Sequence, residues 1–105
     1  MKQKQINWLK NNFSETSEYF TDGYYRFRKS GETGYELAFL VPCACGSNNV
    51  HPQITLENHG TDYIATKLID MEVTPPLVLT RNNQTSSQID EALEKLLKKF
   101  EEVKK

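Results

Sequence analysis

The sequence has little cysteine and no long hydrophobic run. Two cysteines among 105 residues are too few for the disulfide framework of a small secreted scaffold. The longest uninterrupted apolar run covers residues 37–41, whereas a helix that crosses a bilayer needs ~20 apolar residues. The first residues are likewise not followed by the apolar run of a secretory signal. We therefore expect a cytoplasmic protein that does not enter the membrane.

The sequence also lacks an excess of positive charge. Thirteen lysines and arginines stand against fourteen aspartates and glutamates, which leaves a formal net charge of −1. Proteins that bind nucleic acids or anionic membranes usually carry a basic surface. The composition therefore makes nucleic acid an unfavoured partner.

Motifs of known chemistry are absent as well. Gly31 and Gly34 lie in a predicted turn and not before a helix, so they do not form a phosphate-binding loop. There is no internal repeat, and no arrangement of residues matches a catalytic motif. We therefore predict a protein without catalytic activity, whose 105 residues form one domain with a core built from most of its Phe and Tyr side chains.

Two segments have the spacing of amphipathic helices. Apolar residues three to four positions apart predict a short helix over residues 3–13. A longer stripe predicts a helix over residues 87–104, with Ser86 or Ser87 as the N-cap and Asp90 in the first turn. The residues of this stripe are Ile89, Leu93, Leu96, Phe100 and Val103. We expect the longer helix to cover a sheet of the same chain, because a small sheet needs such a cover.

The middle of the chain has the alternating pattern of β-strands. Residues 24–28 and 35–41 alternate around a glycine-containing turn and predict a hairpin, and a third strand follows from about Val50. Residues 63–73 fit a strand or a helix, and their β-branched content favours a strand. A short strand is predicted over residues 77–79. The fold class is therefore α+β: a two-layer structure with a mostly antiparallel sheet of four or five short strands, covered by the C-terminal helix and flanked by the short N-terminal helix.

Both cysteines and both histidines lie within one stretch of the chain, as Cys43, Cys45, His51 and His59. Two thiolates and two imidazoles match the tetrahedral ligand set that Zn²⁺ prefers, and four protein ligands would make the site structural. The spacing is not that of a zinc finger, which separates its cysteines by two to four residues. The alternative is that these residues end a strand and occupy loops without a shared task.

The same two cysteines allow a second chemical interpretation. A disulfide between Cys43 and Cys45 would close a very small ring and would be easily reduced, and either thiol could in principle act as a nucleophile. No lysine or arginine lies between Lys29 and Lys67 to lower a thiol pKa. A thiol-based redox or cysteine enzyme is therefore the less supported interpretation.

One face of the first hairpin strand carries aromatic and basic side chains, since Tyr24, Arg26 and Arg28 alternate with apolar residues. With Tyr19 nearby, the tyrosine rings could stack on the bases of a single-stranded nucleic acid, and the arginines could neutralise its phosphates. The favoured interpretation is an outer sheet face with cross-strand ion pairs, for which Glu36 is a suitable neighbour.

The sequence thus predicts a small, non-catalytic binding or regulatory module of the inhibitor or adaptor type, which acts by contact with a protein partner. Zinc held by Cys43, Cys45, His51 and His59 would be its structural cofactor. One alternative is the binding of single-stranded nucleic acid by Tyr24, Arg26 and Arg28. The other is thiol chemistry at Cys43 and Cys45.

Overall fold

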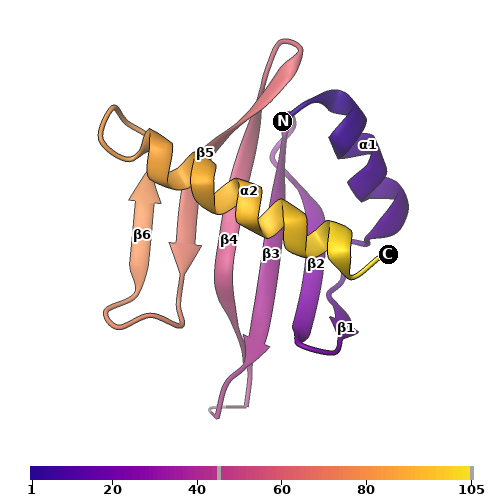
Figure 1. Ribbon diagram of the computed structural model, residues 1–105, viewed down its shortest axis with the longest axis vertical. Coiled ribbons are helices and arrows are strands. Elements are labelled where there is room, and N and C mark those ends of the chain that lie inside the picture. The colour runs from indigo at the N-terminus through magenta and orange to yellow at the C-terminus, as the bar shows by residue number, and fades with distance from the viewer. Residues whose placement is uncertain (45, 105) are drawn as a thin grey trace.

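The computed structural model describes residues 1–44 and 46–104. The chain begins with helix α1 (Gln3–Asn12), continues through six strands and ends with helix α2 (Ser86–Glu102) (Figure 1). The strands are β1 (Glu18–Phe20), β2 (Gly23–Ser30), β3 (Gly34–Pro42), β4 (Asn48–His59), β5 (Asp62–Asp70) and β6 (Leu77–Thr80). The predicted helices are confirmed, and so is the choice of a strand for residues 63–73, although β5 ends at Asp70 and residues 71–73 lie outside it.

The six strands form a single sheet in chain order, and every neighbouring pair is antiparallel. This confirms the α+β class, but the expected number of four or five strands is too small. The missed strand is β1, which has only three residues and follows a polar segment without apolar alternation. It forms because Glu18–Phe20 pairs with the first residues of β2, a long-range contact that local sequence does not reveal.

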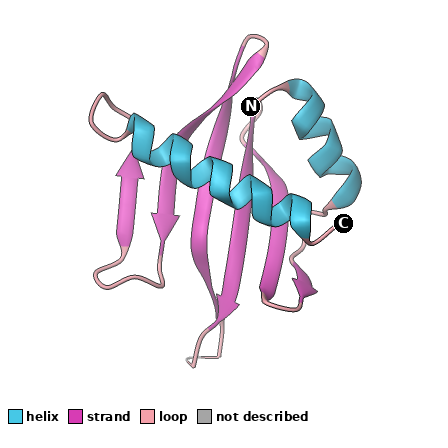
Figure 2. Cartoon of the chain, in the orientation of Figure 1, coloured by secondary structure: helices cyan, strands magenta, loops and turns pink. Residues whose placement is uncertain are grey.

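Both helices pack on the same face of the sheet (Figures 1 and 2). Helix α2 crosses the strands obliquely, while α1 lies beside the β1–β2 end of the sheet. Aromatic rings join the helices to each other and to the sheet: the ring centroids of Phe13, at the end of α1, and Phe100 are 4.7 Å apart, and those of Tyr25 on β2 and Phe100 are 5.0 Å apart. Neither helix in the described part of the chain is long and apolar enough to span a membrane.

Helix α2 begins one residue earlier than the sequence indicates. Its N-cap is Thr85 and not Ser86 or Ser87, and its first turn contains no acidic residue, so Asp90 lies further into the helix than predicted. The reason is the preceding turn, in which the side-chain oxygen of Asn82 accepts a hydrogen bond from the backbone N–H of Thr85 at 2.9 Å. Asparagine in such turns competes with the helix for backbone groups and sets where the helix can start.

The segment after α1 lies against the free edge of β2. The carbonyl oxygen of Ser14 accepts a hydrogen bond from the backbone N–H of Phe27 at 3.2 Å. Further along, the carboxylate of Glu15 accepts one from the backbone N–H of Lys29 at 3.3 Å. These contacts cover the edge of β2 beyond the short β1 strand and place α1 next to the β2–β3 hairpin.

Candidate functional site

The face of the sheet opposite the two helices is not covered by any described element, and we call it the open face. The register of the strands places its residues in rows that run across the sheet. One row contains Arg26, Ala38, Gln53, Ile69 and Val78. The neighbouring row contains Arg28, Glu36, Thr55, Lys67 and Thr80. Both rows begin with an arginine on β2, and toward β6 the first row ends in apolar residues whereas the second ends in polar ones.

Arg26 is half-buried although no helix covers it. Its Nη2 atom donates a hydrogen bond to the side-chain oxygen of Gln53 at 2.8 Å. Ala38 lies between these two residues in the row and is fully buried, so the arginine crosses over the small alanine side chain. The Nε atom of Arg26 is buried without a hydrogen-bond partner. Burial, together with the neighbouring Arg28 guanidinium, lowers the pKa of Arg26, although an arginine remains charged at neutral pH.

Arg28 has the partner that Arg26 lacks. Its Nε atom lies 2.7 Å from the Oε1 atom of Glu36, directly across the β2–β3 pair. This confirms the cross-strand pairing with Glu36 that the sequence predicts. Because Glu36 is used by Arg28, no carboxylate among residues 1–44 and 46–104 forms an ion pair with Arg26. Arg26 is therefore a half-buried positive charge whose nearest carboxylate, Glu36, is engaged by Arg28.

Two tyrosines extend the open face toward β1. Tyr24 and Tyr19 are directly paired between β2 and β1, and their ring centroids are 5.1 Å apart in an edge-to-face arrangement. The side of Tyr19 that faces away from Tyr24 is open to solvent, since 63% of its surface is exposed. The predicted shared face of Tyr24, Arg26 and Arg28 is thus present in the fold. Tyrosine and arginine are enriched among the residues that dominate binding energies.

The two histidines of the predicted zinc site are not brought together. His51 lies near the start of β4 and His59 is its last residue, eight positions further along the strand. At ~3.3 Å per residue the two are roughly 25 Å apart, so one metal ion cannot bind both. The Nδ1 atom of His51 instead lies 2.8 Å from the Oδ1 atom of Asp70, and the Nε2 atom of His59 lies 3.9 Å from Glu57.

Cys43 lies in the turn between β3 and β4. The backbone N–H of Cys43 donates to the carbonyl oxygen of Ser47 at 2.8 Å, which closes the turn. The sulfur of Cys43 is in a disulfide bond, so it is not a thiolate in this state, and Cys45 lies outside the described residues. Within the part of the chain that the structure describes, no group of three or more His, Cys, Asp or Glu side chains could hold a metal ion.

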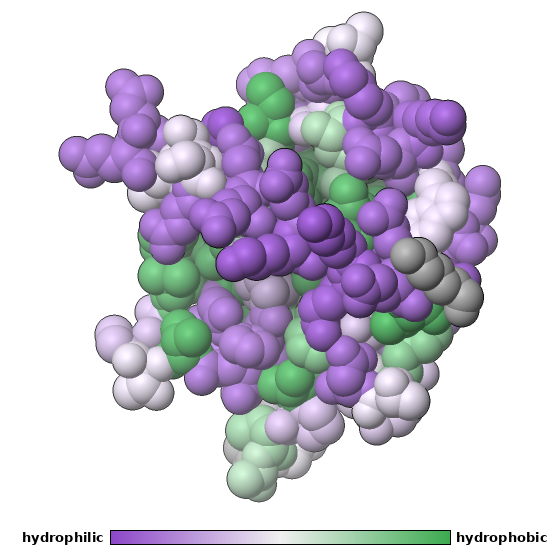
Figure 3. Space-filling view, in the orientation of Figure 1, coloured by the Kyte–Doolittle hydropathy of each residue, from purple (hydrophilic) through white to green (hydrophobic). Residues whose placement is uncertain are grey.

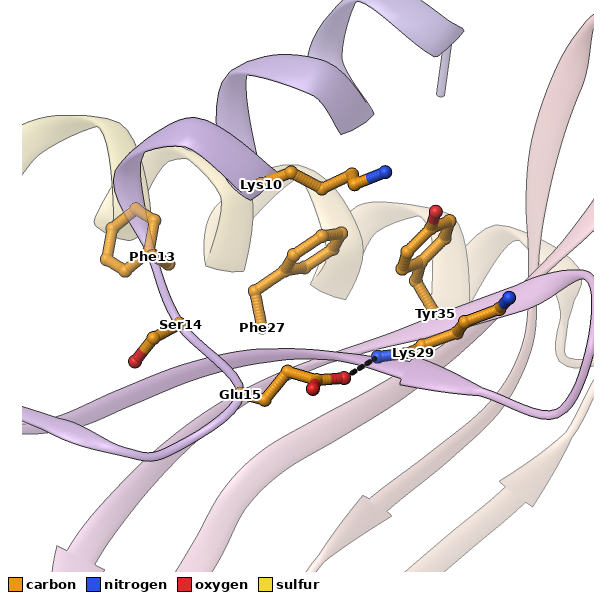
Figure 4. A pocket seen from close by; sticks show the side chains of 7 residues that line it. All are labelled: Lys10, Phe13, Ser14, Glu15, Phe27, Lys29 and Tyr35. Carbon is orange, nitrogen blue, oxygen red and sulfur yellow. Dashed lines mark hydrogen bonds between the residues drawn. The ribbon is translucent and has the colours of Figure 1, made fainter.

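A hollow of about 280 Å³ lies on the helix side, between the end of α1 and the β2–β3 hairpin (Figure 4). We call it the lysine hollow, and it is lined by Lys10, Phe13, Ser14, Glu15, Phe27, Lys29 and Tyr35. Sequence reasoning did not find it, because its residues come from four separate segments. The only local signal is the alternation of Phe27 and Lys29 in the first strand of the predicted hairpin.

A second hollow of about 260 Å³ lies between α2 and strands β4–β6. Leu68, Leu77 and Leu96 contribute its apolar surface, with Asp70 and Lys99 at its margin. Figure 3 shows the same arrangement at the surface, where the outward side of α2 is hydrophilic and hydrophobic side chains gather beside it toward β6. No described segment of the chain covers this part of the sheet.

Comparison with known proteins adds no relative from which a function could be transferred: no family model, no curated protein and no solved structure matches this chain.

Proposed function

We propose that this protein is a non-catalytic binding module, and that the open face of its sheet binds a protein segment rich in carboxylate and apolar side chains. Such a segment would lie across the strands along the row from Arg26 to Val78. A carboxylate would meet the unpaired guanidinium of Arg26, and apolar side chains would cover Ile69 and Val78. This corresponds to the inhibitor or adaptor role that the sequence predicts.

The observation that carries the proposal is the half-buried charge of Arg26. Its guanidinium has one hydrogen bond, to Gln53, and its Nε atom is buried without a partner. Removing a charged group from water without pairing it destabilises the folded state. A carboxylate from a partner would supply the missing charge and could bind the planar guanidinium through two hydrogen bonds.

The apolar end of the row supports a protein as the occupant. Val78 is 57% exposed on the outermost strand and lies beside Ile69 in the register. A nucleic acid would gain little from this apolar end, because its phosphates bind to positive charges. Tyr19 and Tyr24 do offer stacking surface for bases, so nucleic acid is retained as a competing outcome of the test.

The decisive variant is Arg26→Met, which keeps the long apolar stem and removes the charge. Because an unpaired half-buried charge is replaced by a side chain of similar volume, we expect the free energy of unfolding to stay equal or to rise by about 1 kcal/mol. Binding should fall at least about tenfold, since the charge partner of the carboxylate is gone. The matched control is Lys95→Met, which removes a positive charge from the exposed side of α2.

The measurement is a map of backbone amide NMR shifts with two probes, a short peptide of alternating glutamate and valine and a single-stranded oligothymidylate. We expect the peptide to shift signals of β2–β5, to lose this effect in Arg26→Met and to keep it in Lys95→Met. Shifts of the open face by the oligothymidylate alone would replace the proposal with nucleic-acid binding. No shift on the open face with either probe would disprove it.

A further inference from the structure

We infer that the lysine hollow is a binding site for a small planar aromatic anion, such as an aromatic carboxylate. It lies on the helix side of the sheet, and none of its lining residues belongs to the open face. The inference is therefore independent of the proposed protein-binding function. It rests on an aromatic floor and two lysine side chains that the fold brings together from different elements.

The floor of the hollow is aromatic and rigid. The rings of Phe27 on β2 and Tyr35 on β3 are stacked, with centroids 5.1 Å apart and planes 11° from parallel. Phe27 is 3% exposed and Phe13, at the other end of the hollow, is 6% exposed, so both are held by the core. The accessible aromatic surface is therefore mainly that of the half-buried Tyr35, which the buried Phe27 ring holds in place. Such a fixed aromatic surface favours a ligand with a planar ring, which packs against it at little entropic cost.

The ammonium groups of Lys10 and Lys29 lie on the two sides of Tyr35. The Nζ atom of Lys10 lies 5.8 Å from the centroid of the Tyr35 ring. Figure 4 shows the Lys10 ammonium group near the hydroxyl end of Tyr35, and the Lys29 ammonium group on the other side of Tyr35, away from Phe13. Neither lysine forms an ion pair with any residue in the described ranges 1–44 and 46–104.

The one carboxylate in the lining is already engaged. Glu15 accepts a hydrogen bond from the backbone N–H of Lys29 and is directed toward β2 (Figure 4). The lining therefore carries two positive charges against one negative charge. An anionic group at the Tyr35 hydroxyl could accept a hydrogen bond from it and would meet the ammonium group of Lys10, while the charge of Lys29 adds to the attraction.

The size of the hollow sets the class of ligand. A volume of about 280 Å³ is at the lower end of the range for small-molecule sites and is too small for a nucleotide together with its phosphates. A fused two-ring aromatic carboxylate combines the planar body and the single anionic group that the lining complements. For a molecule of that size, we expect a Kd on the order of 0.1–1 mM.

The test compares 2-naphthoate with the neutral 2-naphthalenemethanol, which has the same ring system without the charge. Binding is followed by NMR shifts and by isothermal titration. We expect 2-naphthoate to shift signals of Phe27 and Tyr35, and to bind at least about tenfold more tightly than the alcohol. Equal affinity for the two probes, shifts located elsewhere, or no binding of 2-naphthoate at millimolar concentration would each disprove the inference.

Matched variants separate the site from general charge effects. The double variant Lys10→Gln/Lys29→Gln should weaken 2-naphthoate binding at least about tenfold. The control Lys95→Gln/Lys98→Gln makes the same change of net charge on the exposed side of α2 and should leave the affinity unchanged. An equal loss in both double variants would contradict the inference. Arg26→Met should not affect 2-naphthoate binding, because Arg26 lies on the open face. The two proposals can therefore be tested separately.

Discussion

The ammonium group of Lys99 lies 2.7 Å from the Oδ2 atom of Asp22, so it joins the end of α2 to the turn between β1 and β2. The same Nζ atom lies 4.3 Å from the centroid of the Phe39 ring. The Asp22 carboxylate also accepts a hydrogen bond from the Tyr25 hydroxyl at 3.1 Å. These contacts fix the crossing of α2 over the sheet at its β1–β2 end. The helix thereby covers one face of the sheet and leaves the open face free.

The Lys99–Asp22 pair makes the stability depend on pH in the acid range. The hydrogen bond from Lys99 lowers the pKa of Asp22 below its ordinary value of 3.8. The stabilisation is therefore present above the unfolded-state pKa and is lost as the pH falls through the folded-state pKa. Both side chains are partly exposed, so we expect Asp22→Asn to lower the free energy of unfolding by only about 0.2–1 kcal/mol at neutral pH.

Urea denaturation of the parent and of Asp22→Asn between about pH 6 and pH 2 tests this prediction. The variant should lose less stability on acidification than the parent. Some acid sensitivity should remain, since the pKa values of Asp62 and Asp90 are also lowered by their lysine and arginine partners. If the free energy of unfolding had the same pH dependence in the parent and the variant, Asp22 would not contribute to the acid sensitivity.

Gly34 is required by a close approach of two backbone segments. A Cβ atom at this position would lie 2.5 Å from the carbonyl oxygen of Leu56 and 2.8 Å from that of Ser30. Neither oxygen belongs to a flexible side chain, so Gly34→Ala must displace the strand pairing of β3. We expect the free energy of unfolding to fall by about 1–3 kcal/mol. Thermal or urea denaturation measures the change.

Gly31 in the same hairpin turn is the control for this substitution. A Cβ atom there would meet nothing within 4 Å, and its φ of +66° is one that asparagine tolerates. We expect Gly31→Asn to change the free energy of unfolding by less than about 1 kcal/mol. If Gly31→Asn lowered the free energy of unfolding as much as Gly34→Ala, the loss would come from the turn conformation and not from the close approach of the backbone at Gly34.

Arg81 joins the end of β6 to α2 through two hydrogen bonds. Its Nη1 and Nη2 atoms lie 2.8 Å and 3.0 Å from the two carboxylate oxygens of Asp90. Its Nη1 atom also donates to the carbonyl oxygen of Ala65. Lysine cannot reproduce this forked geometry, so Arg81→Lys should lower the free energy of unfolding by about 0.5–1 kcal/mol. A double-mutant cycle with Asp90→Asn isolates the coupling between the two side chains.

The same pair predicts a change that NMR can follow directly. The Arg81 guanidinium holds the pKa of the Asp90 carboxyl below its ordinary value. In Arg81→Lys the pKa of Asp90 should therefore move up toward that value, as read from the side-chain carbonyl shift during an acid titration. An unchanged Asp90 titration would show that the pair does not persist in solution.

The positions of the histidines predict how any zinc binding would behave. Because His59 is at the opposite end of β4 from His51, His59→Ala should leave the zinc stoichiometry of the reduced protein unchanged. Native mass spectrometry with added zinc and a phosphine reductant measures this. Loss of bound zinc in His59→Ala would mean that Cys43, Cys45 and both histidines converge after all, as the sequence pattern suggests.

The C-terminal helix and the strands of the first hairpin were predictable because their signals are local. The spacing of Ile89, Leu93, Leu96 and Phe100 matches one face of a helix, and all four are buried. The N-cap of this helix was not predictable, since it depends on the turn around Asn82. For β1, only the pairing with β2 stabilises an extended conformation.

The amino-acid sequence by itself determined the α+β class, the two helices, the hairpin and the shared face of Tyr24, Arg26 and Arg28. Each of these follows from alternation or helical spacing over a few neighbouring residues. Only the tertiary structure decided that His51 and His59 lie apart, that Arg26 forms no ion pair with a carboxylate of residues 1–44 and 46–104, and that Lys10 and Lys29 line one hollow. Strand register and helix placement set these distances, because they bring together residues whose separation along the chain carries no information about their separation in space.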